Sequence, residues 1–210
     1  MRIYIISILF TTCIWTLHAQ VNDDVLWATL KLVKEMDSKT SIAITPILRL
    51  NNGISDYQNS SLDFSLRRKL ANKWQFQVLS RTWWIPEEKK RQFLWLDVIF
   101  TQKWLKTKLV SNVRYHYALD INNREDPDFI RWKTKFTFPA FGGFSPSFAL
   151  EPWIRMNGFF QLQRMRYEPG INYKFNDRTD LTVVFRREES ENITPYRDFN
   201  MLVVVLQQKL

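Results

Sequence analysis

Cysteine is nearly absent from this 210-residue chain, which holds only Cys13, close to its start. A single cysteine forms no internal disulfide, so the sequence is not that of a small disulfide-stapled domain. Histidine is almost as scarce, with His18 and His116 the two in the chain. Because the usual zinc sites combine several Cys and His ligands, the sequence predicts no metal site and no cofactor.

Long hydrophobic runs are also lacking beyond the first residues. Arg2 precedes an apolar run that ends at Leu17-His18-Ala19, which has the form of a secretory signal peptide with its cleavage site. We therefore expect residues 1–19 to be removed on export. No later stretch approaches the roughly 18 consecutive apolar residues of a membrane-spanning helix, so only strands are left as a means of crossing a membrane.

Charge is unbalanced but not clustered. Lys and Arg number 30 against 21 Asp and Glu, without a long basic run. The chain therefore lacks the basic arm typical of nucleic-acid binding. Glycine is scarce, with five residues, and no internal repeat divides the sequence. Residues 20–210 are predicted to form a single domain, since their number suits one fold.

A two-residue alternation of apolar and polar side chains runs through most of the chain, and it is typical of strands. In FIRWKTKFTF, residues 129–138, one face carries Ile130, Trp132, Phe136 and Phe138, and the other carries Arg131, Lys133 and Lys135. Strands are expected at residues 25–35, 40–51, 60–69, 73–84, 92–103, 107–119, 128–138, 146–157, 161–175, 180–189 and 198–208.

These strands are mostly longer than the five or six residues common in globular proteins. Ten tilted residues rise roughly 25 Å, the height of the apolar band of an outer-membrane barrel. Short connectors alternate with longer polar ones, as the turns and loops of such barrels do. Aromatic residues near the strand ends predict interfacial girdles; they are Trp83, Trp84, Trp95, Trp104, Phe136, Phe138, Tyr173 and Phe175.

The same alternation also fits a soluble β-protein with its apolar face inward. The export signal, the strand lengths, the alternating connectors and the mixture of Arg with Asp and Glu favour the membrane form. We predict an all-β fold, a transmembrane antiparallel up-and-down β-barrel of ten to twelve strands. Eleven segments are counted, but bacterial single-chain barrels usually have even numbers, which indicates ten or twelve. Three prolines fall inside strands and are expected at bulges or rims, namely Pro46, Pro152 and Pro169.

In a membrane barrel the polar faces of the strands point into the lumen. The predicted lumen-facing charged network consists of Arg49, Arg67, Arg81, Asp97, Arg114, Arg131, Glu151, Arg155, Arg164, Arg166, Glu168, Arg186 and Glu188. Arginine outnumbers the carboxylates of these faces. Two interpretations stay open: salt bridges that plug the interior, and a narrow pore or binding cavity that favours anions.

The pattern of strand-borne basic and aromatic residues resembles a family of uncharacterised Gram-negative outer-membrane barrels, the domain of unknown function 2490. The residues that carry the resemblance are Trp27, Lys31, Lys34, Ile44, Arg49, Arg81, Arg114, Arg155, Arg164, Met165, Arg166, Phe185 and Arg186. It covers roughly residues 25 to 208 and implies an outer-membrane barrel without an assigned activity. The chain departs from the aromatic residue that commonly ends such barrels, since it finishes Gln207-Gln208-Lys209-Leu210.

The function predicted from these observations is that of a non-enzymatic barrel of the cell outer membrane. Its expected partners are outer-membrane lipid and the outer-membrane assembly machinery. One alternative is a lipid hydrolase carried on the barrel, in which His116 would need a serine within hydrogen-bond reach. Another is a soluble exported lipocalin-like binding protein.

Overall fold

The computed structural model describes residues 24–51, 56–86, 90–119, 128–156, 160–191 and 199–210. The predicted signal peptide, residues 1–19, lies outside the described residues. Eleven strands account for most of the described chain: β1 (Asp24–Glu35), β2 (Thr40–Asn51), β3 (Asp56–Lys69), β4 (Trp74–Trp84), β5 (Arg91–Trp104), β6 (Thr107–Ala118), β7 (Phe129–Thr137), β8 (Phe144–Arg155), β9 (Gln161–Lys174), β10 (Thr179–Ser190) and β11 (Phe199–Lys209). Among the described residues, no helix long and apolar enough to cross a membrane is found.

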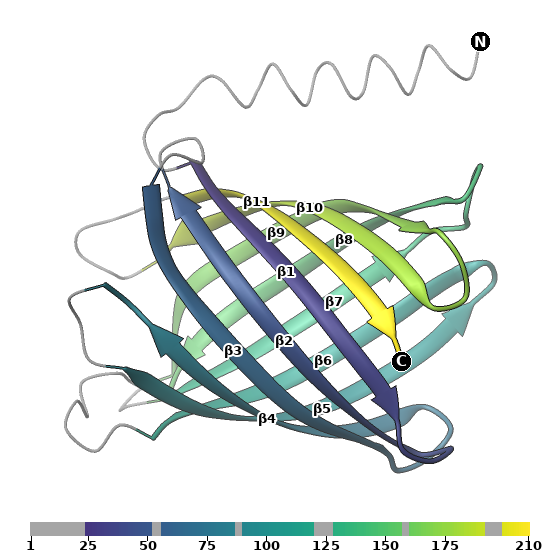
Figure 1. The fold of residues 1–210 in the computed structure, drawn as a ribbon, viewed down its shortest axis with the longest axis horizontal. Coiled ribbons are helices and arrows are strands. Elements are labelled where there is room, and N and C mark those ends of the chain that lie inside the picture. Colours follow the sequence, from purple (N-terminus) through teal and green to yellow (C-terminus); the bar gives the residue numbers. More distant parts are fainter. Residues whose placement is uncertain (1–23, 52–55, 87–89, 120–127, 157–159, 192–198) are drawn as a thin grey trace, which may run out of the picture.

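The strands form one closed barrel in which each strand pairs with its sequence neighbours (Figure 1). The prediction of an all-β barrel is confirmed. The expectation of an even strand number is wrong, because β1 and β11 close the barrel side by side in parallel. All other neighbours are antiparallel. An odd number of strands can close only if one pair runs parallel, and here that pair joins the two ends of the sheet.

The two ends of the barrel differ in their connections. At one end, which we call the short-turn end, β1–β2, β3–β4, β5–β6, β7–β8 and β9–β10 are joined; the other end is the long-connector end (Figure 1). Asp37 fixes the first short turn, because its carboxylate accepts hydrogen bonds from the backbone N–H groups of Lys39 and Thr40 at 2.6 and 2.7 Å. These bonds hold the pKa of Asp37 below its ordinary value. β1 begins at the long-connector end, whereas β11 ends at the short-turn end.

Of the three prolines predicted at bulges or rims, Pro46 and Pro169 lie in mid-strand away from either, which corrects the prediction for them, whereas Pro152 directly precedes a bulge. Each interrupts the ladder with one neighbour, because proline has no N–H to donate. Between β1 and β2 the pairing passes from Thr29↔Ile47 to Leu32↔Ile44, so it skips Pro46. The same two-register gap occurs at Pro152 between β7 and β8, and at Pro169 between β9 and β10. The two bulges lie at Arg49/Leu50 and at Trp153/Ile154, the second directly after Pro152.

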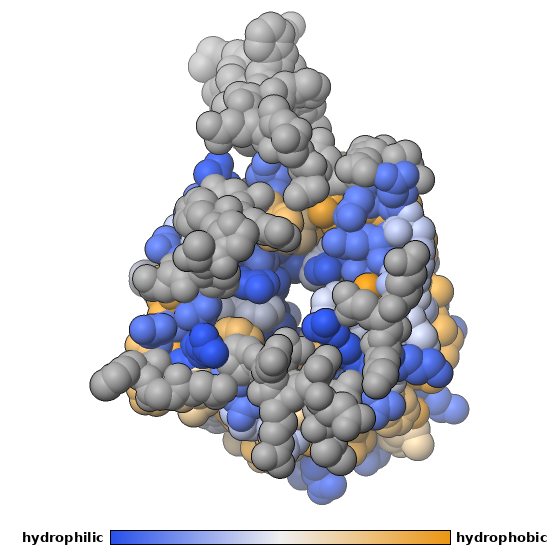
Figure 2. All heavy atoms as spheres, turned by 90° about the vertical axis from the view of Figure 1, so that its left-hand side faces the viewer, coloured by the Kyte–Doolittle hydropathy of each residue, from blue (hydrophilic) through white to orange (hydrophobic). Residues whose placement is uncertain are grey.

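The wall of the barrel is apolar outside and charged inside. Leu62 and Phe64 on β3 are 42% and 51% exposed, whereas Asp63 between them is 5% exposed. The largest fully buried side chains are Glu151, Glu188 and Asp97. Viewed from the long-connector end, Figure 2 shows polar residues around a central hollow and apolar residues on the flanks. The buried residues thus include many charged and polar side chains beside two small apolar clusters, unlike the mainly apolar core of a typical water-soluble domain.

Gly170 marks a close approach between β9 and β10. A Cβ added there would lie 2.9 Å from the carbonyl oxygen of Val183 and 2.9 Å from Cγ2 of Val184. We expect Gly170→Ala to lower the free energy of unfolding by about 1–3 kcal/mol, since the added methyl group has no space. Denaturant unfolding of the refolded barrel measures this loss. Ser145→Ala on β8 is the control, because it adds no atom; equal stability of the two variants would contradict the close approach.

Candidate functional site: an arginine- and tryptophan-lined cavity

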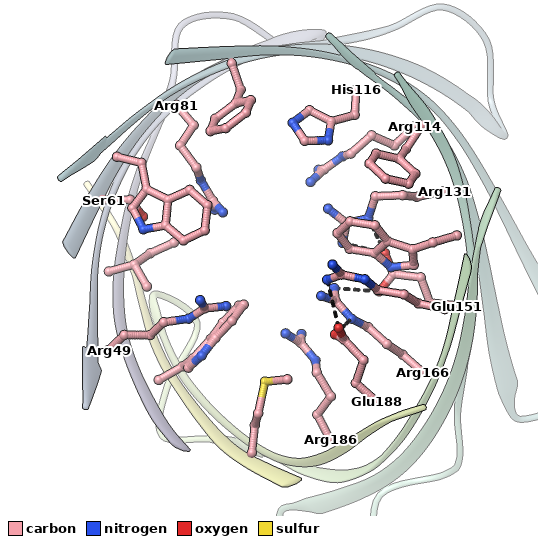
Figure 3. A pocket seen from close by; sticks show the side chains of 18 of the residues that line it. Arg49, Ser61, Arg81, Arg114, His116, Arg131, Glu151, Arg166, Arg186 and Glu188 are labelled. Carbon is pink, nitrogen blue, oxygen red and sulfur yellow. Dashed lines mark hydrogen bonds and ion pairs between the residues drawn. The ribbon is translucent and has the colours of Figure 1, made fainter. Parts of the chain in front are cut away.

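A cavity of about 550 Å³ occupies the half of the barrel nearest the long-connector end. Inward-facing side chains from all eleven strands line it, and Figure 3 shows them converging on an open centre. The lining includes eight arginines and Lys133 but only two carboxylates, Glu151 and Glu188. The cavity is therefore electropositive, which disposes it towards anions.

Five interior carboxylates, Asp63, Asp97, Glu151, Glu168 and Glu188, are each held by a cation on a neighbouring strand. Asp97 lies directly opposite Arg114 in the pairing of β5 with β6, and the guanidinium donates to both carboxylate oxygens at 2.6 and 2.7 Å. Such bidentate pairs are the strongest of their kind. The other interior pairs are Arg81–Asp63 (2.6 Å), Arg131–Glu151 (2.5 Å), Arg166–Glu188 (2.5 Å), Arg164–Glu188 (2.9 Å), Arg186–Glu168 (2.6 Å) and Lys133–Glu168.

Tryptophan rings lie between these cations. Arg81 and Arg114 both stack on Trp95, each with its guanidinium carbon 4.3 Å from the ring centroid. Arg131 and Arg166 flank Trp153 in the same way at 4.0 and 4.1 Å. A ring face attracts a cation and leaves the guanidinium edge free to donate hydrogen bonds. The rings therefore hold the arginines in fixed positions around the cavity.

Arg49 differs from the other lining arginines. Its guanidinium carbon lies 3.8 Å from the ring of Trp27 and 5.5 Å from that of Trp83. Within the described residues it forms no ion pair. Figure 3 shows it projecting into the cavity from the wall opposite Arg131 and Glu151. Its donors are thus aimed at open space, as those of an anion-binding group are.

The predicted network residues all lie on inward-facing positions, at different depths. Nine line the cavity: Arg49, Arg81, Arg114, Arg131, Glu151, Arg164, Arg166, Arg186 and Glu188. Asp97 and Glu168 pair with lining cations from positions just behind them. Arg67 lies nearer the short-turn end and donates to Gln77 at 2.6 and 2.8 Å. Arg155 is half-buried outside the lining, and its Nε has no hydrogen-bond partner among the described residues.

The aromatic part of this cavity was not predicted from the sequence. Trp83 and Trp95 are inside the barrel and line the cavity, so their assignment to an interfacial girdle is wrong. Trp27 and Trp153 line it as well. The alternation held the signal, because Trp95 is two residues from Asp97 and shares its face.

His116 lies on the cavity wall among aromatic rings. Its ring centroid is 4.8 Å from that of Phe93 and 5.3 Å from that of Trp95, whose ring plane is perpendicular to it. Neither ring nitrogen has a hydrogen-bond partner among the described residues, so they show no Ser–His pair. The hydrolase alternative thus gains no geometric support. Across all the residues that the structure describes, no group of three or more His, Cys, Asp or Glu side chains is placed to hold a metal ion.

No family model matches the chain, and neither the curated proteins nor the solved structures include a match. The resemblance to the domain of unknown function 2490 therefore stays a prediction. The barrel and its cavity are thus what indicate a function.

Proposed function

We propose that this protein is an integral barrel of the outer membrane and that its cavity takes up anions at the long-connector end. The observation that carries the proposal is the reversal of polarity across the wall, with Asp63 buried between the exposed Leu62 and Phe64. Lipid can cover such an apolar outer face, whereas water disfavours it. Closure of the sheet supports the same reading, because a barrel leaves no strand edge unpaired in lipid.

The proposal includes the partners and the route that the sequence predicts. The apolar outer face would contact outer-membrane lipid, the export signal would deliver the chain, and the outer-membrane assembly machinery would insert it. A lipocalin-like binder needs an apolar cavity for its ligand. The lining here includes apolar side chains such as Val25, Phe93 and Met201, but its eight arginines and Lys133 suit an anionic ligand better than a purely apolar one.

Membrane insertion is tested on isolated outer membranes. We expect the protein to stay with the membranes after a carbonate wash and to change its gel mobility on boiling, because a closed barrel resists detergent until it is heated. Recovery of the protein in the soluble periplasmic fraction, without a mobility shift, would refute the proposal.

Anion preference follows from the excess of arginine around the cavity. Asp63, Asp97 and Glu168 neutralise lining cations from behind, yet the nine lining cations still outnumber these three carboxylates and the two lining glutamates together. Rings of Arg and Lys favour anions in pores. In bilayers with a salt gradient, we expect the reversal potential to show preference for chloride over potassium. Cation preference would contradict the proposal, and absence of any current would identify the ion-pair network as a plug.

Arg49 should contribute most to this preference, because no carboxylate among the described residues compensates its charge. We expect Arg49→Ala to reduce the chloride-to-potassium permeability ratio by about two-fold or more. Arg68→Ala is the matched control: it removes the same charge from an exposed position on the outer face of β3. If both variants keep the ratio of the parent protein, Arg49 is not an anion-binding group.

A further inference from the structure

The three proline gaps differ in what crosses them on the inner side of the wall. At the gap between β9 and β10, Arg186 and Glu168 are the residues left out of the ladder, and their ion pair of 2.6 Å bridges it. At the gap between β7 and β8, Arg131 reaches Glu151 at 2.5 Å. The inner residues at the β1–β2 gap are Thr45 and Lys31, and within the described residues Lys31 makes no ion pair. The β1–β2 gap is therefore the one of the three that no ion pair of the described residues bridges.

An apolar groove of about 720 Å³ lies on the outer surface over the β1–β2 gap. Leu30, Pro46, Leu48, Leu62 and Leu206 line it. The lining also includes Ile47 and Ser61, and both of these residues line the inner cavity as well. The outer groove and the inner cavity thus share part of the wall at the place where the ladder is interrupted.

β1 is the strand that combines a parallel seam with an interrupted ladder. On one side it has the interrupted ladder with β2, and on the other it has the parallel seam with β11. Parallel pairing is slightly less stable per residue than antiparallel pairing. A small outward movement of β1 opposite Pro46 would join the groove to the cavity close to Arg49, which lies three residues from Pro46 on β2 and lines the cavity.

We infer that the β1–β2 gap is a lateral portal through which a single-chain anionic amphiphile passes from the surrounding lipid into the cavity. The hydrocarbon chain matches the leucine-lined groove, and the anionic head matches Arg49 and the other cavity arginines. A compact phosphate or carboxylate head suits these donors, and one chain suits a groove of this volume. The inference rests on the proposed function, because it requires lipid around the barrel and an anion-binding interior.

A disulfide across the strands beside the gap tests the portal. Ala28→Cys with Leu48→Cys places two cysteines directly opposite each other on the outer face of β1 and β2. Ile42→Cys with Leu66→Cys is the matched control across β2 and β3, whose ladder is continuous at that position. Each protein is reconstituted in phosphatidylcholine vesicles and compared in its oxidised and reduced forms. Rapid filtration measures the binding of radiolabelled dodecyl phosphate over time. The amount bound by protein-free vesicles is subtracted.

We expect oxidation of the portal pair to slow dodecyl phosphate binding by about ten-fold, a factor that corresponds to about 1.4 kcal/mol in the barrier. Binding of inorganic phosphate from solution should stay unchanged, since it enters through the mouth. The control pair should show no effect of oxidation on either probe. Equal rates for the oxidised and reduced portal pair would overturn the portal while leaving the anion cavity intact. If reduced protein binds neither probe, the proposed function itself fails.

Pro46→Ala gives a second test that needs no crosslink. Alanine restores the N–H that the ladder lacks, so we expect slower dodecyl phosphate binding in this variant. Pro152→Ala is the control, because an ion pair already secures that gap. Faster or unchanged binding in Pro46→Ala would count against the portal.

Discussion

Phe64→Arg should lower the free energy of unfolding of the vesicle-embedded barrel by about 2–4 kcal/mol, the cost of a basic residue on the lipid face near the midplane. Phe64 lies in the middle of β3, points outward and is 51% exposed. If water covered this face, the same substitution would change stability by no more than about 0.5 kcal/mol. The variant therefore separates a lipid-facing from a water-facing surface by energy, independently of where the protein is found in the cell.

Met36→Arg is the matched control for this measurement. Met36 is also apolar and 58% exposed, but it lies in the first short turn, beyond the end of β1. Arginine at that depth can reach water, so we expect little loss. Urea titration of both variants in the same vesicles provides the comparison. Equal stabilities of Phe64→Arg and the parent protein would show that the outer face is not in lipid.

The alternation of side chains carried most of the information that the sequence held about the barrel. It separates Asp63 from Leu62 and Phe64, and the structure buries the first and exposes the others. It also placed Arg131 on the inward face of FIRWKTKFTF, where it lines the cavity. The error with Trp95 arose from using its place near a strand end in preference to its face.

To predict which side chains pair across two strands, the register of the strands must be known as well as the face on which each side chain lies. The two-residue turn between Trp104 and Thr107 sets the register of β5 and β6, and that register puts Asp97 opposite Arg114. This ion pair could have been derived from the sequence. The contact of Arg131 with Glu151 could not, because a longer connector and the gap at Pro152 lie between their strands.

The parallel closure had no local signal at all. β1 and β11 are the first and last strands, so no turn joins them and no connector length fixes their direction. Eleven strand segments were predicted from the sequence, but the even strand number usual in bacterial barrels favoured ten or twelve. Contacts between the chain ends are the most distant in sequence, and only the assembled barrel determines them.

Glu188→Gln should be the most destabilising single change inside the barrel, with a loss of about 3–5 kcal/mol, the range for breaking a buried ion pair on one side. Glu188 is 2% exposed and accepts hydrogen bonds from Arg164 at 2.9 Å and Arg166 at 2.5 Å. Arg166 would keep only Glu151, whose carboxylate is 3.6 Å away. Glutamine keeps the shape of the side chain, so the loss reports the missing negative charge.

The adjacent residue supplies the control. Glu189→Gln removes the same charge from the outer face, where Glu189 pairs with the exposed Arg187 at 2.9 Å. Exposed pairs contribute about 0–1 kcal/mol, so this variant should stay close to the parent protein. Arg164→Gln added to Glu188→Gln should recover part of the loss, because it removes a cation that has lost its partner. If the two glutamate variants unfold at the same urea concentration, the interior network does not hold the barrel together and its charges are free to serve ligands alone.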